Sequence, residues 1–224
     1  MLKLFKIRGK ERTRYFRDET GMFVDWSQLD KLPEIDTLID IGVGPMGTPD
    51  LYKRFSSAKL LLVDPLDETE SYINKNLLSR EVMFHKCGVE NEAAEVTMHV
   101  QEEIGSSSIL KVADINYESD PVDKRKIQIK TLDSITNSEN NLGKLGIKID
   151  TEGYELNIIL GATETLKSAE FVLAEVRHNH ESFQGVYKLH EFVNAMHDNG
   201  FFLSMIITAK PFIADLCFQP RKGL

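Results

Sequence analysis

The chain has 224 residues, of which 42% are hydrophobic and 28% are charged, and its net charge is −8 at neutral pH. These values are typical of one globular domain with a full core, and no apolar run of about 18 residues supports a membrane-spanning helix or a secretory signal. The two cysteines, Cys87 and Cys217, are too few for a disulfide framework and do not have metal-site spacing, so we expect a reducing, cytoplasmic setting.

The charge is unevenly distributed. Residues 1–17 carry seven basic residues against one acidic residue, a net charge of +6, whereas the other 20 basic and 34 acidic residues give the remainder −14. Such a basic arm can contact an anionic surface or pack on its own acidic domain, and the acidic remainder argues against general nucleic-acid binding. We expect residues 1–34 to form an N-terminal basic extension with a short helix at 26–31, and residues 35–224 to form the main domain. Oligomer formation stays open.

From residue 35 the sequence alternates between apolar runs and segments with helical spacing. The apolar runs predict strands at 38–41, 59–63, 82–87, 145–149, 170–176, 201–208 and 214–218. Helical spacing predicts helices at 49–56, 67–78, 155–166 and 186–199. Strands at 95–100 and 126–130, with long polar loops between them, predict an insertion that can cover a ligand. The short connection through Lys210-Pro211 forces an antiparallel pair at one end of a mostly parallel α/β sheet.

The segment from Thr37 to Thr48 joins the first predicted strand to a glycine turn and a helix start. Gly42, Gly44 and Gly47 follow the strand with G-x-G-x-x-G spacing. Glycine lets the backbone turn sharply and approach a ligand closely. This order of strand, turn and helix predicts a nucleotide-like ligand above the carboxyl edge of a parallel sheet.

Two acidic residues near this turn indicate which ligand it holds. Asp64 ends the second strand, 22 residues after Gly42, where a carboxylate can accept hydrogen bonds from the ribose of NAD or of S-adenosylmethionine. Asp40 lies near the end of the first strand, where a carboxylate would repel a pyrophosphate but suits an amino group and a sulfonium. We therefore expect S-adenosylmethionine as cofactor. Asp40 can also cap the turn by accepting backbone N–H groups, and the two roles are compatible.

Several spaced motifs resemble the FkbM-type methyltransferase family. They are Asp40-Ile-Gly-Val-Gly-Pro-Met-Gly47, Val63-Asp64-Pro65, Lys130-Thr-Leu-Asp-Ser-Ile135, Lys148-Ile-Asp-Thr-Glu-Gly-Tyr-Glu155 and Leu160-Gly-Ala162. Together they cover roughly residues 35–202 in the right order. The family more often has glutamate at Asp64 and an Ala-Asn pair at Gly44-Pro45. The resemblance implies a Rossmann-like, seven-stranded class I methyltransferase with helices on both faces. It also implies methyl transfer from S-adenosylmethionine to a hydroxyl oxygen, commonly of a sugar or a polyketide-like product.

The candidate catalytic residues are Asp150, Glu152 and His178. Asp150 ends the fourth parallel strand, so its carboxylate can act as the general base or orient the acceptor, or it can cap the next helix. Glu152 can share the catalytic role or serve as a first-turn acid. His178 follows the fifth strand, where an imidazole can accept the hydroxyl proton. Glu175, inside that strand, is an alternative orienting acid. Asp150 and Glu152 can also hold a divalent cation together, with His178 as a third ligand. The sequence offers no tight ligand cluster, however, so we predict no metal.

Two further residues are expected to contact the cofactor. Gly88 follows the third strand, where folds of this type present backbone groups to the adenine, and its neighbour Cys87 is expected in the core. Ser107 lies in a serine-rich patch that can close on the cofactor or form an ordinary polar loop. An NAD-dependent oxidoreductase and a non-catalytic module with a nucleotide-binding fold remain the alternative functions.

Overall fold

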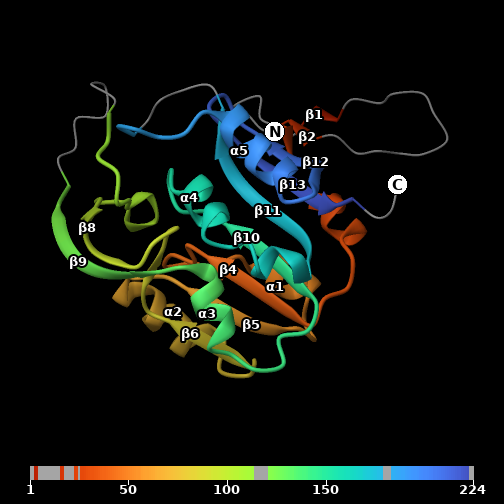
Figure 1. The fold of residues 1–224 in the computed structure, drawn as a ribbon, viewed down its shortest axis with the longest axis horizontal. Helices are drawn as coiled ribbons and strands as arrows, with labels where there is room; N and C mark the ends of the chain where they lie inside the picture. Colours follow the sequence, from red (N-terminus) through yellow and green to blue (C-terminus); the bar gives the residue numbers. More distant parts are fainter. Residues whose placement is uncertain are drawn as a thin grey trace.

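The computed structural model describes residues 3–4, 16–17, 23–24, 26–113, 121–178 and 183–221. Within these ranges the chain forms one large sheet with helices packed on its two faces and a smaller sheet at one side (Figure 1). The strands of the large sheet are β1 (Lys3–Leu4), β2 (Phe16–Arg17), β3 (Phe23–Val24), β4 (Thr37–Ile41), β5 (Lys59–Val63), β6 (Val82–His85), β10 (Leu145–Ile149), β11 (Ala169–Arg177), β12 (Phe201–Ala209) and β13 (Ile213–Pro220). The small sheet contains β7 (Gly88–Val89), β8 (Ala94–Val100) and β9 (Asp123–Lys130).

The helical elements alternate with these strands along the chain. The α-helices are α1 (Pro49–Arg54), α2 (Asp67–Asn76), α3 (Leu132–Asn137), α4 (Glu155–Leu160) and α5 (Leu189–Asp198). Short 3-10 helices are η1 (Trp26–Lys31), η2 (Ile104–Ser106) and η3 (Thr165–Ser168). None of the helices in the described ranges has the length and the apolar character needed to cross a bilayer.

The large sheet confirms the predicted architecture. Its strand order is β1-β2-β3-β12-β13-β11-β10-β4-β5-β6. The neighbours from β6 to β11 pair in parallel, whereas β13 pairs antiparallel with both β11 and β12. The seven strands from β12 to β6 are thus the expected mostly parallel sheet with one terminal antiparallel hairpin. Because the parallel strands end at one edge, the residues that follow β4, β5, β10 and β11 meet there.

Two apolar cores cover the two faces of the sheet, as the period-two pattern of the strands requires. On β4, Leu38 packs in the core that includes side chains of η1 and α1, with α2 packed against it. Its neighbours Ile39 and Ile41 pack in the other core, with α3, α4 and α5. All three side chains are at most 1% exposed. The strand is therefore buried on both faces, and its end is held rigidly under the glycine turn.

The structure differs from the predicted elements at several places. The expected helix at 155–166 ends at Leu160, because Gly161 closes it, and the chain continues into η3. The sequence did not predict α3, a helix of six residues whose start is capped by the Thr131 side chain, which accepts from Ser134 N. The strands β1, β2 and β3 were also not expected in the N-terminal extension, and β3 pairs with β12. The predicted helix at 26–31 is present as η1.

The small sheet is the predicted insertion. β8 and β9 pair antiparallel along their length, and β7 joins β9 in parallel. Its apolar side packs on Leu66, which follows β5, and Arg125 of β9 makes two hydrogen bonds to the Glu68 carboxylate on α2, at 2.9 and 3.1 Å. The third strand of the large sheet ends at His85, earlier than predicted, because Cys87 and Gly88 turn toward this small sheet. Residues 118–120 of the predicted acidic turn at 118–123 lie outside the described residues.

Candidate active site

A cavity of about 550 Å³ lies at the carboxyl edge of the large sheet. Its lining includes the glycine turn after β4, and also η2 with the serines that follow it. Apolar side chains of the small sheet, including Met98 and Ile127, line one part of the cavity. Carboxylates that follow β10 or lie on β11 and β13 line another part. The cavity therefore joins an apolar compartment to an acidic one.

The three glycines of the turn have different physical requirements. A Cβ on Gly42 would lie 1.7 Å from the backbone oxygen of Asp150, so this glycine allows the turn to touch the end of β10. A Cβ on Gly47 would lie 2.6 Å from the ring of Tyr72 on α2. A Cβ on Gly44, which lines the cavity, would meet no described atom within 4 Å. The backbone of Gly44 is therefore open to a ligand.

Asp64 lies under this turn and lines the cavity. Its Oδ2 accepts from Gly44 N and its Oδ1 from Leu66 N, both at 2.8 Å. The residue is 3% exposed, and burial raises the pKa of its carboxyl group, although the two backbone N–H groups oppose that shift. A carboxylate has about four acceptor positions, so Asp64 fixes the turn and keeps acceptor capacity toward the cavity.

Asp40 does not line the cavity. It is 0% exposed, and its Oδ2 accepts from the Tyr52 hydroxyl at 2.5 Å and from the Thr48 hydroxyl at 3.1 Å. Its Oδ1 lies 3.5 Å from Lys148 Nζ. The two hydroxyl groups occupy Oδ2, whereas Oδ1 is buried without a hydrogen-bond partner among the described residues. Because Asp40 is buried outside the cavity lining, its charge acts on the turn and on Lys148, and the expected direct contact with a ligand amino group is not made in this geometry.

Lys148 links this buried acid to the acidic compartment. Its Nζ lies 3.2 Å from Asp150 Oδ2 and donates to Gly42 O at 3.4 Å. Burial alone would lower the pKa of Lys148, but the carboxylates of Asp150 and Asp40 outweigh burial and raise the pKa above its usual value. Lys148 is therefore a fixed positive charge that holds Asp150 against the glycine turn.

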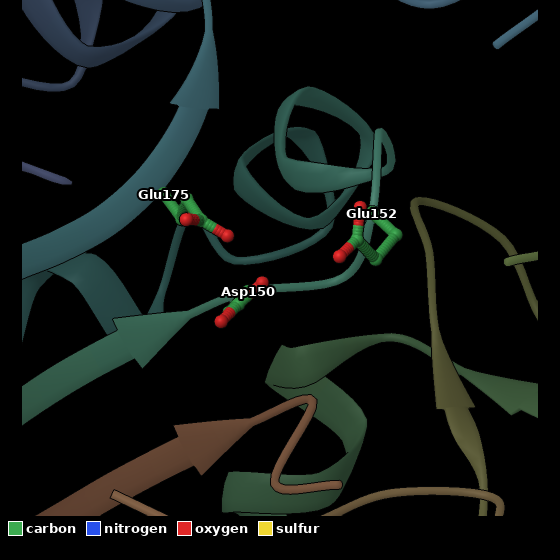
Figure 2. Close-up of side chains that lie close together, drawn as sticks. All are labelled: Asp150, Glu152 and Glu175. Atoms are coloured by element: carbon green, nitrogen blue, oxygen red, sulfur yellow. The ribbon is translucent and has the colours of Figure 1, made fainter. Parts of the chain in front are cut away.

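Three carboxylates meet in the acidic compartment. Asp150 and Glu152 lie on the loop between β10 and α4, and Glu175 comes from β11; Figure 2 shows the three side chains around one common space. One oxygen from each lies within 4.8 Å of the others. Each carboxylate is also paired with a protein cation, Asp150 with Lys148, Glu152 with Arg177 and Glu175 with Lys210.

Burial and mutual repulsion disfavour full ionisation of this group. Burial raises the pKa of Glu152 to about 7, although the Arg177 guanidinium lowers it. Burial, followed by the charges of Asp150 and Asp215, raises the pKa of Glu175 to about 8. At pH 7 Glu175 is therefore mostly protonated and Glu152 about half ionised, so the compartment contains both a proton donor and a proton acceptor.

The other residues predicted from the sequence to form the site are His178, Gly88 and Ser107, and the structure places only the last two in the cavity lining. His178 follows β11, but its side chain is exposed, lies outside the cavity lining and bonds to Lys210 O at 3.1 Å, so it does not join the carboxylates. Gly88 lines the cavity, but a structural reason for this glycine is also present. A Cβ at this position would lie only 2.5 Å from the side chain of Ile129. Ser107 lines the cavity and its Oγ accepts from Gln101 N at 3.1 Å.

From the sequence, Glu175 was considered only as an alternative orienting acid, and Asp215 was not considered. Both residues line the cavity, and they are register partners on the antiparallel strands β11 and β13. Asp215 is further held by the hydroxyl of Thr208 on β12. The sequence did contain one signal for Glu175. Glu175 and Arg177 are two residues apart on β11, so their side chains lie on the same face of the strand.

Comparison with known structures supports the fold. An O-methyltransferase family protein from Burkholderia thailandensis matches with a TM-score of 0.50 and 11% identity, over 89% of this chain and 56% of that one. The chain thus spans little more than half of the Burkholderia protein. A protein of Listeria monocytogenes described as an S-adenosylmethionine-dependent methyltransferase matches with a TM-score of 0.49 and 10% identity, over 88% and 98% of the two chains. No curated protein matches the sequence significantly.

The family itself follows from the sequence profile. The profile of the methyltransferase FkbM domain matches residues 45–203, which is well over half of the chain. This range includes the end of the glycine turn, Asp64, the small sheet and the three carboxylates of the acidic compartment. The chain therefore belongs to the FkbM methyltransferase family.

Proposed function

We propose that this protein transfers the methyl group of S-adenosylmethionine to a hydroxyl oxygen of a small molecule, a sugar or a glycan. The observation that carries the proposal is the cavity in which an open glycine turn, Asp64 and an apolar compartment adjoin converging carboxylates. Gly44 and Asp64 would hold the ribose and the methionine part of the cofactor, and the apolar side chains of the small sheet would surround the adenine. When bound, the cofactor supplies an activated methyl group on a positively charged sulfur.

The acidic compartment suits the acceptor. We assign Asp150 to orienting the hydroxyl, because Lys148 and the contact with Gly42 hold it beside the turn. Glu152 accepts the hydroxyl proton, because a base with a pKa of about 7 is half ionised at neutral pH and still takes up a proton readily. Glu175 donates a hydrogen bond from its protonated carboxyl group. The cofactor would supply the methyl group and its sulfur would keep the electron pair of the broken bond, while Glu152 takes the proton that the acceptor oxygen loses.

The lining of this compartment supports a hydroxyl-rich acceptor without negative charge. Around the three carboxylates it also contains the polar side chains of Asp215, Thr208 and Lys210. Carboxylates accept hydrogen bonds from sugar hydroxyls. Each of the three carboxylates is already paired with a lysine or an arginine, so the compartment offers many hydrogen-bonding groups and, among its described residues, no unpaired cation for an acidic acceptor.

The direct test is transfer of a labelled methyl group from S-adenosylmethionine to a panel of neutral sugars, sugar phosphates and aromatic alcohols. We expect label in neutral hydroxyl compounds, and loss of that label in Asp150→Asn. Label found only in amines, in phosphorylated sugars or in no member of a broad panel would contradict the proposed acceptor class.

The remaining assignments follow the same proposal. We propose that residues 35–224 form the catalytic domain and residues 1–34 an extension whose basic arm contacts an anionic surface. A cytoplasmic location is consistent with the free, buried thiols of Cys87 and Cys217.

A further inference from the structure

Three consecutive serines border the cavity, and their side chains have different surroundings. Ser106 ends η2, and the Ser107 hydroxyl accepts from Gln101 N. Ser108 is 2% exposed; its hydroxyl donates to the backbone oxygen of Glu152 at 2.8 Å and accepts from Leu110 N at 3.1 Å. Of the hydrogen bonds described for these three side chains, that of Ser108 to Glu152 reaches the catalytic loop.

The loop that carries Glu152 needs support from its surroundings. Glu152 has φ +55° and Gly153 has φ +106°, and a residue with a side chain adopts positive φ only where other contacts hold it. The buried Glu155 carboxylate holds the loop from the α4 side, by accepting from Thr151 N at 2.9 Å and Gly153 N at 3.1 Å. Ser108 holds it from the opposite side.

The same segment forms the wall of the cofactor compartment. Ile104, Gly105 and Ser107 line the same cavity as the glycine turn. Ser108 is fastened to β8 by two backbone hydrogen bonds with His99, at 2.8 and 3.1 Å. Leu110 packs beside Gly153, since its Cδ1 would lie 3.0 Å from a Cβ on that residue. A ligand that orders the 104–107 wall will therefore also order Ser108 and the Glu152 backbone.

We propose that Ser108 is a positioning residue that couples cofactor binding to the placement of Glu152. This rests on the proposed function, because it takes the cavity as the cofactor site and Glu152 as the base. With the cofactor bound, the wall is ordered, the Ser108 hydroxyl fixes the Glu152 carbonyl, and the carboxylate is directed at the acceptor. Without the cofactor, the loop samples other conformations more often.

Hydrogen exchange tests the coupling without a known acceptor, with adenosylhomocysteine as the probe. In the wild type, we expect the probe to slow exchange in peptides covering both 104–113 and 151–154. In Ser108→Ala, exchange of the loop peptide should be about fivefold faster, the factor expected from the loss of one hydrogen bond. The probe should then protect only the wall. Ser108→Cys keeps the shape but donates weakly, so it should behave like the alanine variant even where alanine impairs folding.

Ser204→Ala is the matched control, because the Ser204 hydroxyl also donates to a backbone oxygen, that of Cys217, at 3.0 Å and lies outside the cavity lining. It should leave probe-dependent protection at both peptides as in the wild type. Two results would overturn the coupling. The first is that the probe protects the loop fully in both Ser108 variants, and the second is that the probe binds the wild type but does not protect its loop. Failure of the wild type to bind adenosylhomocysteine in calorimetry would instead refute the proposed function, and the coupling with it.

Discussion

The raised pKa of Glu175 predicts a specific dependence of stability on pH. The folded protein keeps a proton on Glu175 up to about pH 8, whereas the unfolded chain loses it near the ordinary value of 4.5. Raising the pH between these values therefore favours the unfolded state, and the stability that this group contributes below pH 4.5 is lost as the pH rises through about 8. Glu175→Gln keeps the neutral form at every pH, so it removes this loss.

The magnitude follows from the shift. One proton corresponds to about 1.4 kcal/mol per pH unit, so the shift of about 3.5 pH units gives an upper value near ~5 kcal/mol. The Glu175 side chain is 16% exposed and shares its environment with other acids, so we expect about 2 to 3 kcal/mol. The variant and the wild type should be about equally stable at pH 5, and the variant should be more stable by that amount at pH 8.

Urea unfolding followed by circular dichroism from pH 5 to 8.5 measures this difference. The control is Glu164→Gln, which removes a carboxylate that is 63% exposed and should leave the pH slope of the wild type unchanged. Parallel curves for Glu175→Gln and the wild type would refute the claim that Glu175 is protonated in the folded protein at neutral pH.

Three further predictions concern the cavity. Gly42→Ala places a Cβ against Asp150 O, so it should destabilise the protein by more than about 2 kcal/mol and abolish cofactor binding. The control is Gly105→Ala, whose Cβ would meet no described atom within 4 Å and which should show a normal thermal melt. Asp64→Asn should weaken adenosylhomocysteine binding at least about tenfold in calorimetry; unchanged affinity would remove Asp64 from the site. Turnover should rise with pH through about 7 as Glu152 loses its proton, and a profile that falls over this range would exclude it as the base.

Much of the fold could be predicted because its signals are local. The strands β4, β5 and β10 are short apolar runs buried on both faces, and their predicted limits agree with the structure to within one residue. The antiparallel pairing of β12 and β13 followed from a connection too short for a crossover. In contrast, α3 has only six residues, so its helical period was too short to detect, and the capping pair of Thr131 and Ser134 was its only local mark.

The candidate site could be predicted only where a residue directly follows a strand of the parallel sheet. Asp150 and Glu152 were found in this way. Glu175 was underrated in favour of His178, because the choice depends on the pairing of β11 with β13, which places Glu175 opposite Asp215. That register is set by a distant hairpin, and β12 contains two irregularities, so sequence spacing does not determine it.

The interpretation of Asp40 was limited for a similar reason. Its position at the end of β4 was predicted, but its partners were not. Tyr52 reaches it from α1, and Lys148 reaches it from β10, 108 residues further along the chain. A long-range ion pair of this kind leaves no spacing pattern, so the sequence could not distinguish a ligand contact from a structural acid.

Calorimetric titration of the purified protein with S-adenosylmethionine, adenosylhomocysteine and NAD tests the central claim most directly. The open turn at Gly44, the adjacent acceptor Asp64 and the acidic compartment predict micromolar binding of the first two compounds and no binding of NAD. Binding of NAD alone, or of none of the three, would contradict the assignment of this cavity as a methyl-donor site.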